Sequence, residues 1–170
     1  EIVAAHDNGE LTSIAADFDA TVTGTAAATD LTAIATATSG TITASGVTTI
    51  TGTATAIMAA HDDSSELSSI DGDFAATVTG TATEDELSAL NAATSGAIDA
   101  SGVTAITSGT AADVAALISD GTVTLASDVA VTVTGTAAAT DLTSIATATS
   151  GTITASGVTT ITGTAAEIVA

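Results

Sequence analysis

Two hydrophobic periods alternate along the chain. Alanine-rich stretches carry apolar positions at helical spacing, as at Ala27, Leu31 and Ile34 or at Val114, Leu117 and Ile118, and this spacing predicts a helix with one buried face. Beyond each stretch the period falls to two, as in the Thr-Ile-Thr run at 41–43, which predicts a short strand. Two further predicted strands have apolar residues at every second position, which we expect to point into the core, at 74, 76 and 78 and at 129, 131 and 133. Helices and short strands are therefore expected in regular alternation.

Short motifs predict where these elements start, turn and stop. A strand ending in Thr-Gly predicts a tight strand-to-helix corner, with the next threonine as the helix N-cap. Capping-box spacing supports three such starts: Thr81 with Glu84, Thr110 with Asp113, and Thr164 with Glu167. Glycines at 40, 96, 121 and 151 predict helix C-terminal ends. Corners between two strands of one unit are expected at Ala-Ser-Gly (44–46 and 155–157) and at the acidic triplets 17–19 and 71–73.

The Thr-Gly motif, with one Ser-Gly variant, recurs at a nearly constant spacing. Its glycines are 28, 28, 29, 26 and 28 residues apart. They are Gly24, Gly52, Gly80, Gly109, Gly135 and Gly163. Two unit types alternate, because the segment 20–52 returns almost unchanged at 130–163. We interpret residues 1–170 as a single repeat array. Since the first four residues equal the last four, we expect it to be a window of a longer repetitive chain.

A unit of helix, strand, corner and strand that leads into the next copy is typical of one solenoid coil. About 28 residues suffice, because a helix rising ~1.5 Å per residue matches two shorter strands rising ~3.3 Å per residue. We therefore predict an α/β solenoid of about six tandem coils of about 28 residues, with parallel sheets running along it. The alternative is a globular α/β domain of parallel βαβ units.

Charge and composition exclude several classes of function. The chain holds 20 acidic residues, no Lys and no Arg, and its formal net charge is −20. Without cationic side chains we expect no nucleic-acid partner. No apolar run approaches the ~20 residues that span a bilayer, so membrane insertion is not expected. Two histidines and no cysteine argue against a zinc site, and no nucleophile or phosphate-loop pattern is present. We expect no enzymatic activity.

Two runs resemble the repeats of a known family. Residues 87–117 (LSALNAATSGAIDASGVTAITSGTAADVAAL) and 150–170 (SGTITASGVTTITGTAAEIVA) resemble repeats of very large secreted surface proteins of marine cyanobacteria, which are haemolysin-type proteins exported by type I secretion. The resemblance implies an extracellular or cell-surface location, calcium in the surroundings, and a structural, adhesive or motility-related role. The glycine- and aspartate-rich nonapeptides that bind calcium in such proteins are absent from this sequence.

Four aspartates at the acidic corners are candidate calcium ligands. Each corner places two carboxylates on one side of a strand-like segment, and carboxylate oxygens are the ligands that calcium takes. They are Asp17, Asp19, Asp71 and Asp73. The alternative is a solvated acidic rim. Because −20 on a thin rod repels itself, bound cations or high ionic strength are expected to stabilise the fold.

The two histidines hold matching positions at the ends of equivalent predicted helices. His6 is followed by Asp7, and His61 by Asp62. An imidazolium is favoured at a helix C-terminus, so we interpret both as helix-end residues. A metal or pH-sensing role is the alternative.

A Thr-x-Thr pair precedes most of the Thr-Gly glycines. If the intervening residues point inward, these threonines form a flat outward array, ~7 Å apart along a strand and ~4.8 Å apart between strands. They are Thr21, Thr23, Thr49, Thr51, Thr77, Thr79, Thr132, Thr134, Thr160 and Thr162. Such an array resembles the threonine arrays of ice-binding solenoids; the alternatives are ordinary sheet surface and a lateral contact between chains.

The features together favour an extracellular structural repeat protein that forms a filament, sheath or surface layer, with adhesion as a further role and calcium as a stabilising ion. Its expected partners are copies of itself, joined end to end or laterally through open strand edges. The alternative is an ice- or surface-binding solenoid that uses the threonine array.

Overall fold

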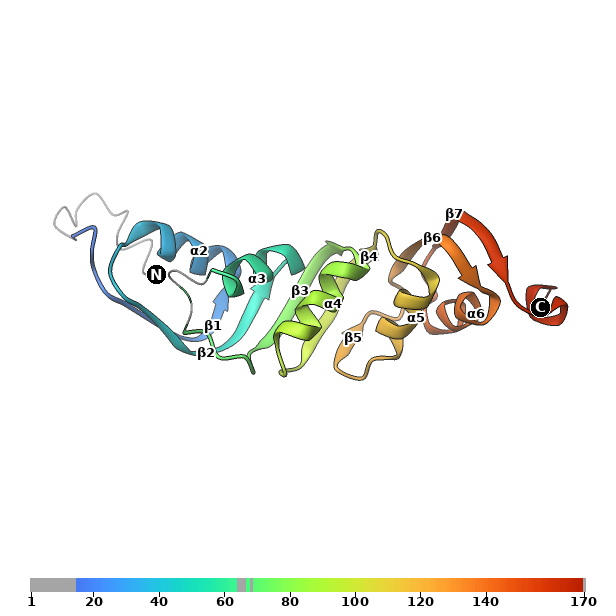
Figure 1. Cartoon of the computed structure of the whole chain (residues 1–170). Helices are drawn as coiled ribbons and strands as arrows, with labels where there is room; N and C mark the ends of the chain where they lie inside the picture. The colour runs from blue at the N-terminus through green and yellow to red at the C-terminus, as the bar shows by residue number, and fades with distance from the viewer. Residues whose placement is uncertain (1–14, 64–66, 68, 170) are drawn as a thin grey trace.

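Strands and helices alternate along the described chain, except where the strand β5 is followed directly by the strand β6 (Figure 1). The computed structural model describes residues 15–63, 67 and 69–169. Its elements in order are β1 (Ala20–Ala27), α2 (Ala28–Ala37), β2 (Ile42–Gly52), α3 (Ala54–His61), β3 (Ala75–Ala82), α4 (Glu84–Ala93), β4 (Ile98–Ile106), α5 (Ala111–Ser119), β5 (Val123–Leu125), β6 (Ala130–Ala138), α6 (Ala139–Ala148), β7 (Ile153–Thr162) and α7 (Ala165–Val169).

The strands form one sheet. Within the described residues it has seven strands, all paired in parallel, in the order β1-β2-β3-β4-β6-β7, with the short β5 also paired to β4. Successive helices contact one another from α2 to α7, so they make a row along the sheet, and the molecule is elongated (Figure 1). The predicted α/β class with a parallel sheet is confirmed.

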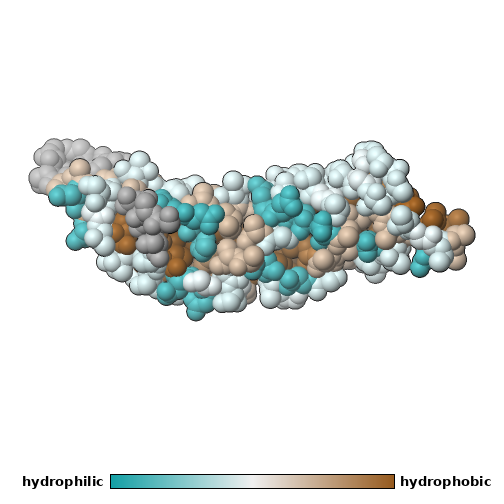
Figure 2. Space-filling view, viewed as in Figure 1, coloured by the Kyte–Doolittle hydropathy of each residue, from teal (hydrophilic) through white to brown (hydrophobic). Residues whose placement is uncertain are grey.

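Each helix packs on the sheet through a narrow stripe. In α2 the buried positions are Ala28, Leu31 and Ile34, three residues apart. The first is alanine in most helices, which brings the backbone of the first turn close to the strands. The expected burial of Leu31 and Ile34 is confirmed, whereas Ala27 is only half-buried and ends β1. The remaining surface is mostly weakly polar or hydrophilic on the face seen in Figure 2.

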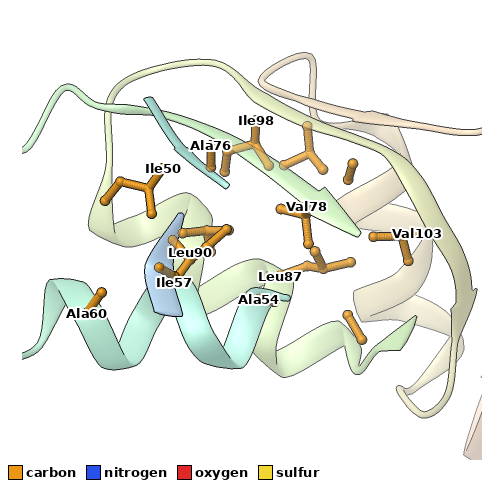
Figure 3. Close-up of a cluster of buried hydrophobic side chains, with 14 of the residues drawn as sticks. Ile50, Ala54, Ile57, Ala60, Ala76, Val78, Leu87, Leu90, Ile98 and Val103 are labelled. Atoms are coloured by element: carbon orange, nitrogen blue, oxygen red, sulfur yellow. The ribbon is translucent and has the colours of Figure 1, made fainter. Parts of the chain in front are cut away.

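The strands supply the other side of the core. Phe74, Ala76 and Val78 are buried, as their alternation predicts, and so are the valines at 129, 131 and 133. Figure 3 shows Ala76 and Val78 of β3 in one cluster with residues of the neighbouring strands and helices. The apolar core is therefore continuous from one strand–helix pair to the next.

The predicted Ala-Ser-Gly corners are wrong, because both lie inside single strands. Residues 44–46 belong to β2 and residues 155–157 to β7. At this point Gly46 lies opposite Thr23 of β1, and the register shifts on both sides of that pair. A Cβ on Gly46 would lie 2.6 Å from Cγ2 of Thr23. The missing side chain of the glycine thus leaves room for the neighbouring threonine at an irregularity that does not end the strand. In these two units the predicted order of helix, strand, corner and strand is replaced by a helix followed by one long strand.

The Thr-Gly motif takes two different places, which accounts for the two unit types. Gly52 closes β2, directly before the N-cap Thr53 of α3, as the predicted corner requires. Gly80 instead lies in the middle of β3, where its φ of +89° suits glycine. Gly24 and Gly135 share this mid-strand position, with φ of +76° and +80°. The corner prediction is wrong for these three glycines.

Helix starts follow the same alternation. Thr110 caps α5 by accepting from the Asp113 N–H at 3.2 Å, as predicted, and Thr164 accepts from the Glu167 N–H at 3.3 Å. The third predicted pair is wrong: α4 starts two residues later than Thr81 implies, and its capping box joins Thr83 and Glu86. The mid-strand glycine postpones the helix, because the strand continues beyond it.

Candidate functional site

A threonine latch joins the end of a helix to an earlier turn. Thr94 is 6% exposed; its Oγ1 donates to the Phe74 carbonyl at 2.5 Å and accepts from the Gly96 N–H at 3.0 Å. The same two bonds recur at Thr38, with Phe18 and Gly40, and at Thr149, with Val129 and Gly151. The threonine and glycine of each latch belong to an Ala-Thr-Ser-Gly run, at 37–40, 93–96 and 148–151, which is the sequence signal that could have located it.

The latch glycines are required by close approach. A Cβ on Gly96 would overlap the main-chain carbonyl oxygens of Asp73 and Phe74, and the glycines at 40 and 151 are crowded in the same way. Within the described residues, none of the three has a positive φ. The helices do end just before these glycines, as predicted, but the reason is contact with an earlier turn, and not the left-handed cap that a helix-ending glycine usually provides.

Polar contacts tie neighbouring units together on the helix side. Oγ1 of Thr55 in α3 donates to Glu86 of α4 at 2.6 Å, and this bond is the largest cause that holds the pKa of the Glu86 carboxyl below its usual range. Nδ2 of Asn91 in α4 donates to Asp120 beyond α5 at 2.8 Å. The hydroxyl of Thr122 donates to the same carboxylate, and is the largest cause that lowers the pKa of Asp120.

One carboxylate is buried where the other long helices have alanine. Glu84, the first residue of α4, is 5% exposed. The hydroxyl of Ser88 donates a hydrogen bond to the Glu84 carboxylate. The main-chain N–H of Glu84 donates to the Ser108 carbonyl at 2.9 Å. A Cβ on Gly109 would lie 2.8 Å from Cβ of Glu84, so the glycine at this position provides the space for Glu84. The sequence predicted Glu84 as the capping partner of Thr81 and not as a buried residue, because acidic residues in a first helical turn are normally solvated.

The acidic corners lie at the turns that precede β1 and β3. All four candidate aspartates are exposed: Asp17, Asp19, Asp71 and Asp73. Oδ1 of Asp19 accepts a hydrogen bond from the Thr41 N–H at 2.8 Å. In the part of the chain that the structure describes, no three acidic or histidine side chains form a metal-binding group. Calcium at these corners stays a prediction, and such a site would need further oxygen ligands beside the two carboxylates of a corner.

His61 lies at a helix end, as predicted. It is the last residue of α3, and its Nδ1 lies 3.0 Å from Oδ1 of Asp62. The imidazole ring also lies 5.5 Å from the ring of Phe74, centroid to centroid. The corresponding pair, His6 and Asp7, lies outside the described residues.

The candidate threonines do not form one two-file array. Thr21 lies opposite Thr43, and Thr49 lies between Thr25 and Ala75. Among the described strand pairs, Thr51 opposite Thr77 is the single place where two candidates face each other. Four of the ten, Thr49, Thr51, Thr77 and Thr132, are half-buried. The motif alternates between the middle and the end of successive strands, which carries its threonines out of line. The flat, two-file threonine array that the ice-binding alternative requires is therefore not formed by the described strands.

Each strand–helix pair packs against the next through apolar side chains of the core. Ile50 of β2 and Ile57 of α3 are both fully buried. They lie in one cluster with Val78, Leu87 and Leu90 of the following pair (Figure 3). We call this packing of β2 and α3 against β3 and α4 the unit interface.

No protein family, curated protein or solved structure matches the chain. Among the described helices, none combines the length and the hydropathy needed to cross a membrane.

Proposed function

We propose that the chain is an extracellular structural repeat protein, an α/β solenoid of about six coils of about 28 residues that assembles with copies of itself into a filament, sheath or surface layer. One observation carries the proposal: strands and helices stack in sequence order, each against the next, through the repeated unit interface. In such an architecture each unit covers its neighbour, so the length of the rod and its buried core grow with every unit added. That is a mechanical property and suits a fibre or layer.

Charge and composition support an exposed, durable assembly. The chain has no Lys or Arg, which removes every site for trypsin-like proteases, and no Cys, which makes it independent of redox state. Its 20 acidic residues repel one another, and calcium at the acidic corners would reduce that repulsion. Adhesion would use the same long, polar surface.

Electron microscopy tests the proposal. The untruncated protein from its source is imaged in calcium and then after addition of a chelator, with magnesium at equal ionic strength as the control. We expect regular filaments or layers that disperse in the chelator. Compact monomers that are indifferent to calcium would contradict the structural role, whereas assemblies that persist in the chelator would contradict only the calcium contribution.

A further inference from the structure

A hollow lies between the ends of α5 and α6 and the turn that joins β5 to β6. Its volume is about 250 Å³, and its apolar lining includes Ile118, Leu125 and Val129. Val129 is 2% exposed, whereas Ser127 of the same lining is exposed, so the hollow opens to solvent on one side. Beyond α6 the row of elements continues with β7 and α7 (Figure 1). The hollow therefore lies within the array and not at its end.

Two other strand–helix pairs carry phenylalanine at the position of Val129. The three latch threonines mark this position, because each donates to the main-chain carbonyl of the residue that holds it: Phe18, Phe74 or Val129. Phe74 is 1% exposed, and its ring lies 5.5 Å from the ring of His61, centroid to centroid. Next to α3, an aromatic ring thus fills the core at this point.

Aliphatic side chains replace both members of that ring pair at the hollow. His61 and Ile118 each directly follow the last buried residue of their helix, so Ile118 takes the place of His61 and Val129 that of Phe74. The segment between them is also shorter, because Val129 follows Ile118 by 11 residues, whereas Phe74 follows His61 by 13. The smaller side chain at position 129 and the shorter segment account for the space left open.

The chemistry of the lining favours an uncharged ligand. None of the lining residues is charged, and the Thr149 hydroxyl among them is already engaged, since it donates to the Val129 carbonyl at 2.6 Å and accepts from the Gly151 N–H at 2.9 Å. An anionic group on a ligand would meet no cation, because the chain has neither Lys nor Arg and a net charge of −20. Affinity must therefore come from the burial of apolar surface.

The size of the hollow suits a single ring. Apolar cavities of about 150 Å³ admit benzene, and drug-sized ligands take pockets of about 300 Å³ or more. The aromatic side chains of this sequence are two phenylalanines, with no Trp or Tyr, and both Phe18 and Phe74 pack on the core of their own units. A ring in this hollow would thus come from a small molecule and not from a second copy of the chain.

We propose that the hollow between α5 and α6 binds a small, uncharged, monocyclic aromatic molecule, whose ring takes the place that the Phe74 ring fills beside α3. The two hydrogen bonds of Thr149 fix the main chain around Val129, so the site is formed before the ligand arrives, which favours binding. The site lies within one chain and does not depend on the proposed assembly.

Fluorine NMR with fluorobenzene as the probe tests the site. We expect saturable binding with one site per chain. Val129→Phe places a ring in the hollow, as Phe74 does in its own unit, and is expected to weaken binding at least about tenfold. Thr124→Phe adds the same ring at an exposed position of β5 outside the lining and should leave the affinity unchanged. Absence of saturable binding to the unmodified chain, or equal affinity in Val129→Phe, would overturn the proposal.

Two further variants keep the test decisive if Val129→Phe does not fold, with circular dichroism as the check of folding. Ala126→Leu narrows the hollow and leaves the buried Val129 in place; it should weaken binding, and unchanged binding would overturn the proposal. Phe74→Val is the reciprocal change, because it removes the ring that fills the equivalent space. We expect a second site per chain in this variant. A single site in folded Phe74→Val would overturn the equivalence of the two positions.

Competition identifies the class of ligand. Toluene is expected to displace fluorobenzene from the unmodified chain, whereas benzoate, which has the same ring and a negative charge, should compete at least about tenfold more weakly. Equal competition by toluene and benzoate would overturn the assignment to uncharged rings.

Discussion

The hydroxyl of Thr94 donates to the main-chain carbonyl of Phe74, 20 residues earlier, at 2.5 Å. The bond connects the end of α4 to the turn that opens β3, on the far side of the strand and helix between them. Because Thr38 and Thr149 repeat it over the same separation, each such strand–helix pair is closed by a bond between its own two ends. The same threonine thus ends the helix and bonds the end of that helix to the start of the preceding strand.

Thr94→Val tests the latch. Valine keeps the shape of the side chain but leaves the Phe74 carbonyl and the Gly96 N–H without their hydroxyl partner, at a cost of about 1–3 kcal/mol in the free energy of unfolding. Urea unfolding followed by circular dichroism measures the loss. Thr81→Val, at an exposed position in β3, is the control and is expected to be nearly neutral. Equal effects of the two variants would show that the latch contributes nothing.

Gly96→Ala tests close packing at the same point. The new Cβ would overlap the carbonyl oxygens of Asp73 and Phe74, so the helix end or the turn must move. We expect a loss of about 1–3 kcal/mol, the usual cost of overpacking. Gly121→Ala is the matched control, because its Cβ would meet open space, and it is expected to be neutral or slightly stabilising. The prediction is wrong if the two midpoints of unfolding coincide.

Glu86→Gln tests the link between α3 and α4 through its pH dependence. Hydrogen bonds, chiefly from Thr55, lower the pKa of Glu86 in the folded state. The stability that the ionised carboxylate contributes is complete above the pKa of an unfolded glutamate, about 4.3, and is lost as the pH falls through the lowered folded value. Glutamine does not titrate and retains the capping-box geometry.

The measurement is the midpoint of urea unfolding over about pH 6 to 3. We expect the acid-induced fall in stability to be smaller in Glu86→Gln than in the unmodified chain. Asp85→Asn removes the same charge from an exposed neighbouring position and is expected to preserve more of the fall. Parallel curves for Glu86→Gln and the unmodified chain would contradict the prediction.

Salt and calcium are expected to stabilise the fold by separate routes. A net charge of −20 without any Lys or Arg leaves intramolecular repulsion uncompensated, so the temperature of unfolding should rise with sodium chloride as the screening length shortens. If the acidic corners bind calcium, calcium adds a further rise at constant ionic strength. Asp71→Asn with Asp73→Asn should then reduce that second rise; an unchanged rise would place the calcium elsewhere.

Ice binding is tested directly by thermal hysteresis. Because the candidate threonines are out of register between neighbouring strands, we expect no more hysteresis than a globular protein of equal concentration produces. Hysteresis that disappears in Thr51→Lys, at the one place where two candidates face each other, would reverse this conclusion in favour of the array.

Local patterns predicted the elements well where the relevant contacts lie within a few residues. The sequence predicts three such features correctly: the buried stripe of Leu31 and Ile34, the alternation of Ala76 and Val78, and the N-cap Thr110. Each depends on periodicity or on a bond within one helical turn. The corners predicted at the Ala-Ser-Gly runs are wrong, because the glycine of each run makes room for a threonine on the neighbouring strand, more than 20 residues away in the sequence. Nothing adjacent in the sequence indicates that contact.

The repeat spacing, the alternation of helix and strand, the parallel α/β class and the buried stripe of each element all follow from local sequence patterns. The folded arrangement was needed to show that Gly80 lies inside a strand while Gly52 ends one, that Thr94 bonds to Phe74, and that the Thr-x-Thr pairs are out of line. Propensity and periodicity act along the chain, whereas register and close approach are set by the strand that lies alongside. The same short motif therefore takes different positions in successive strands.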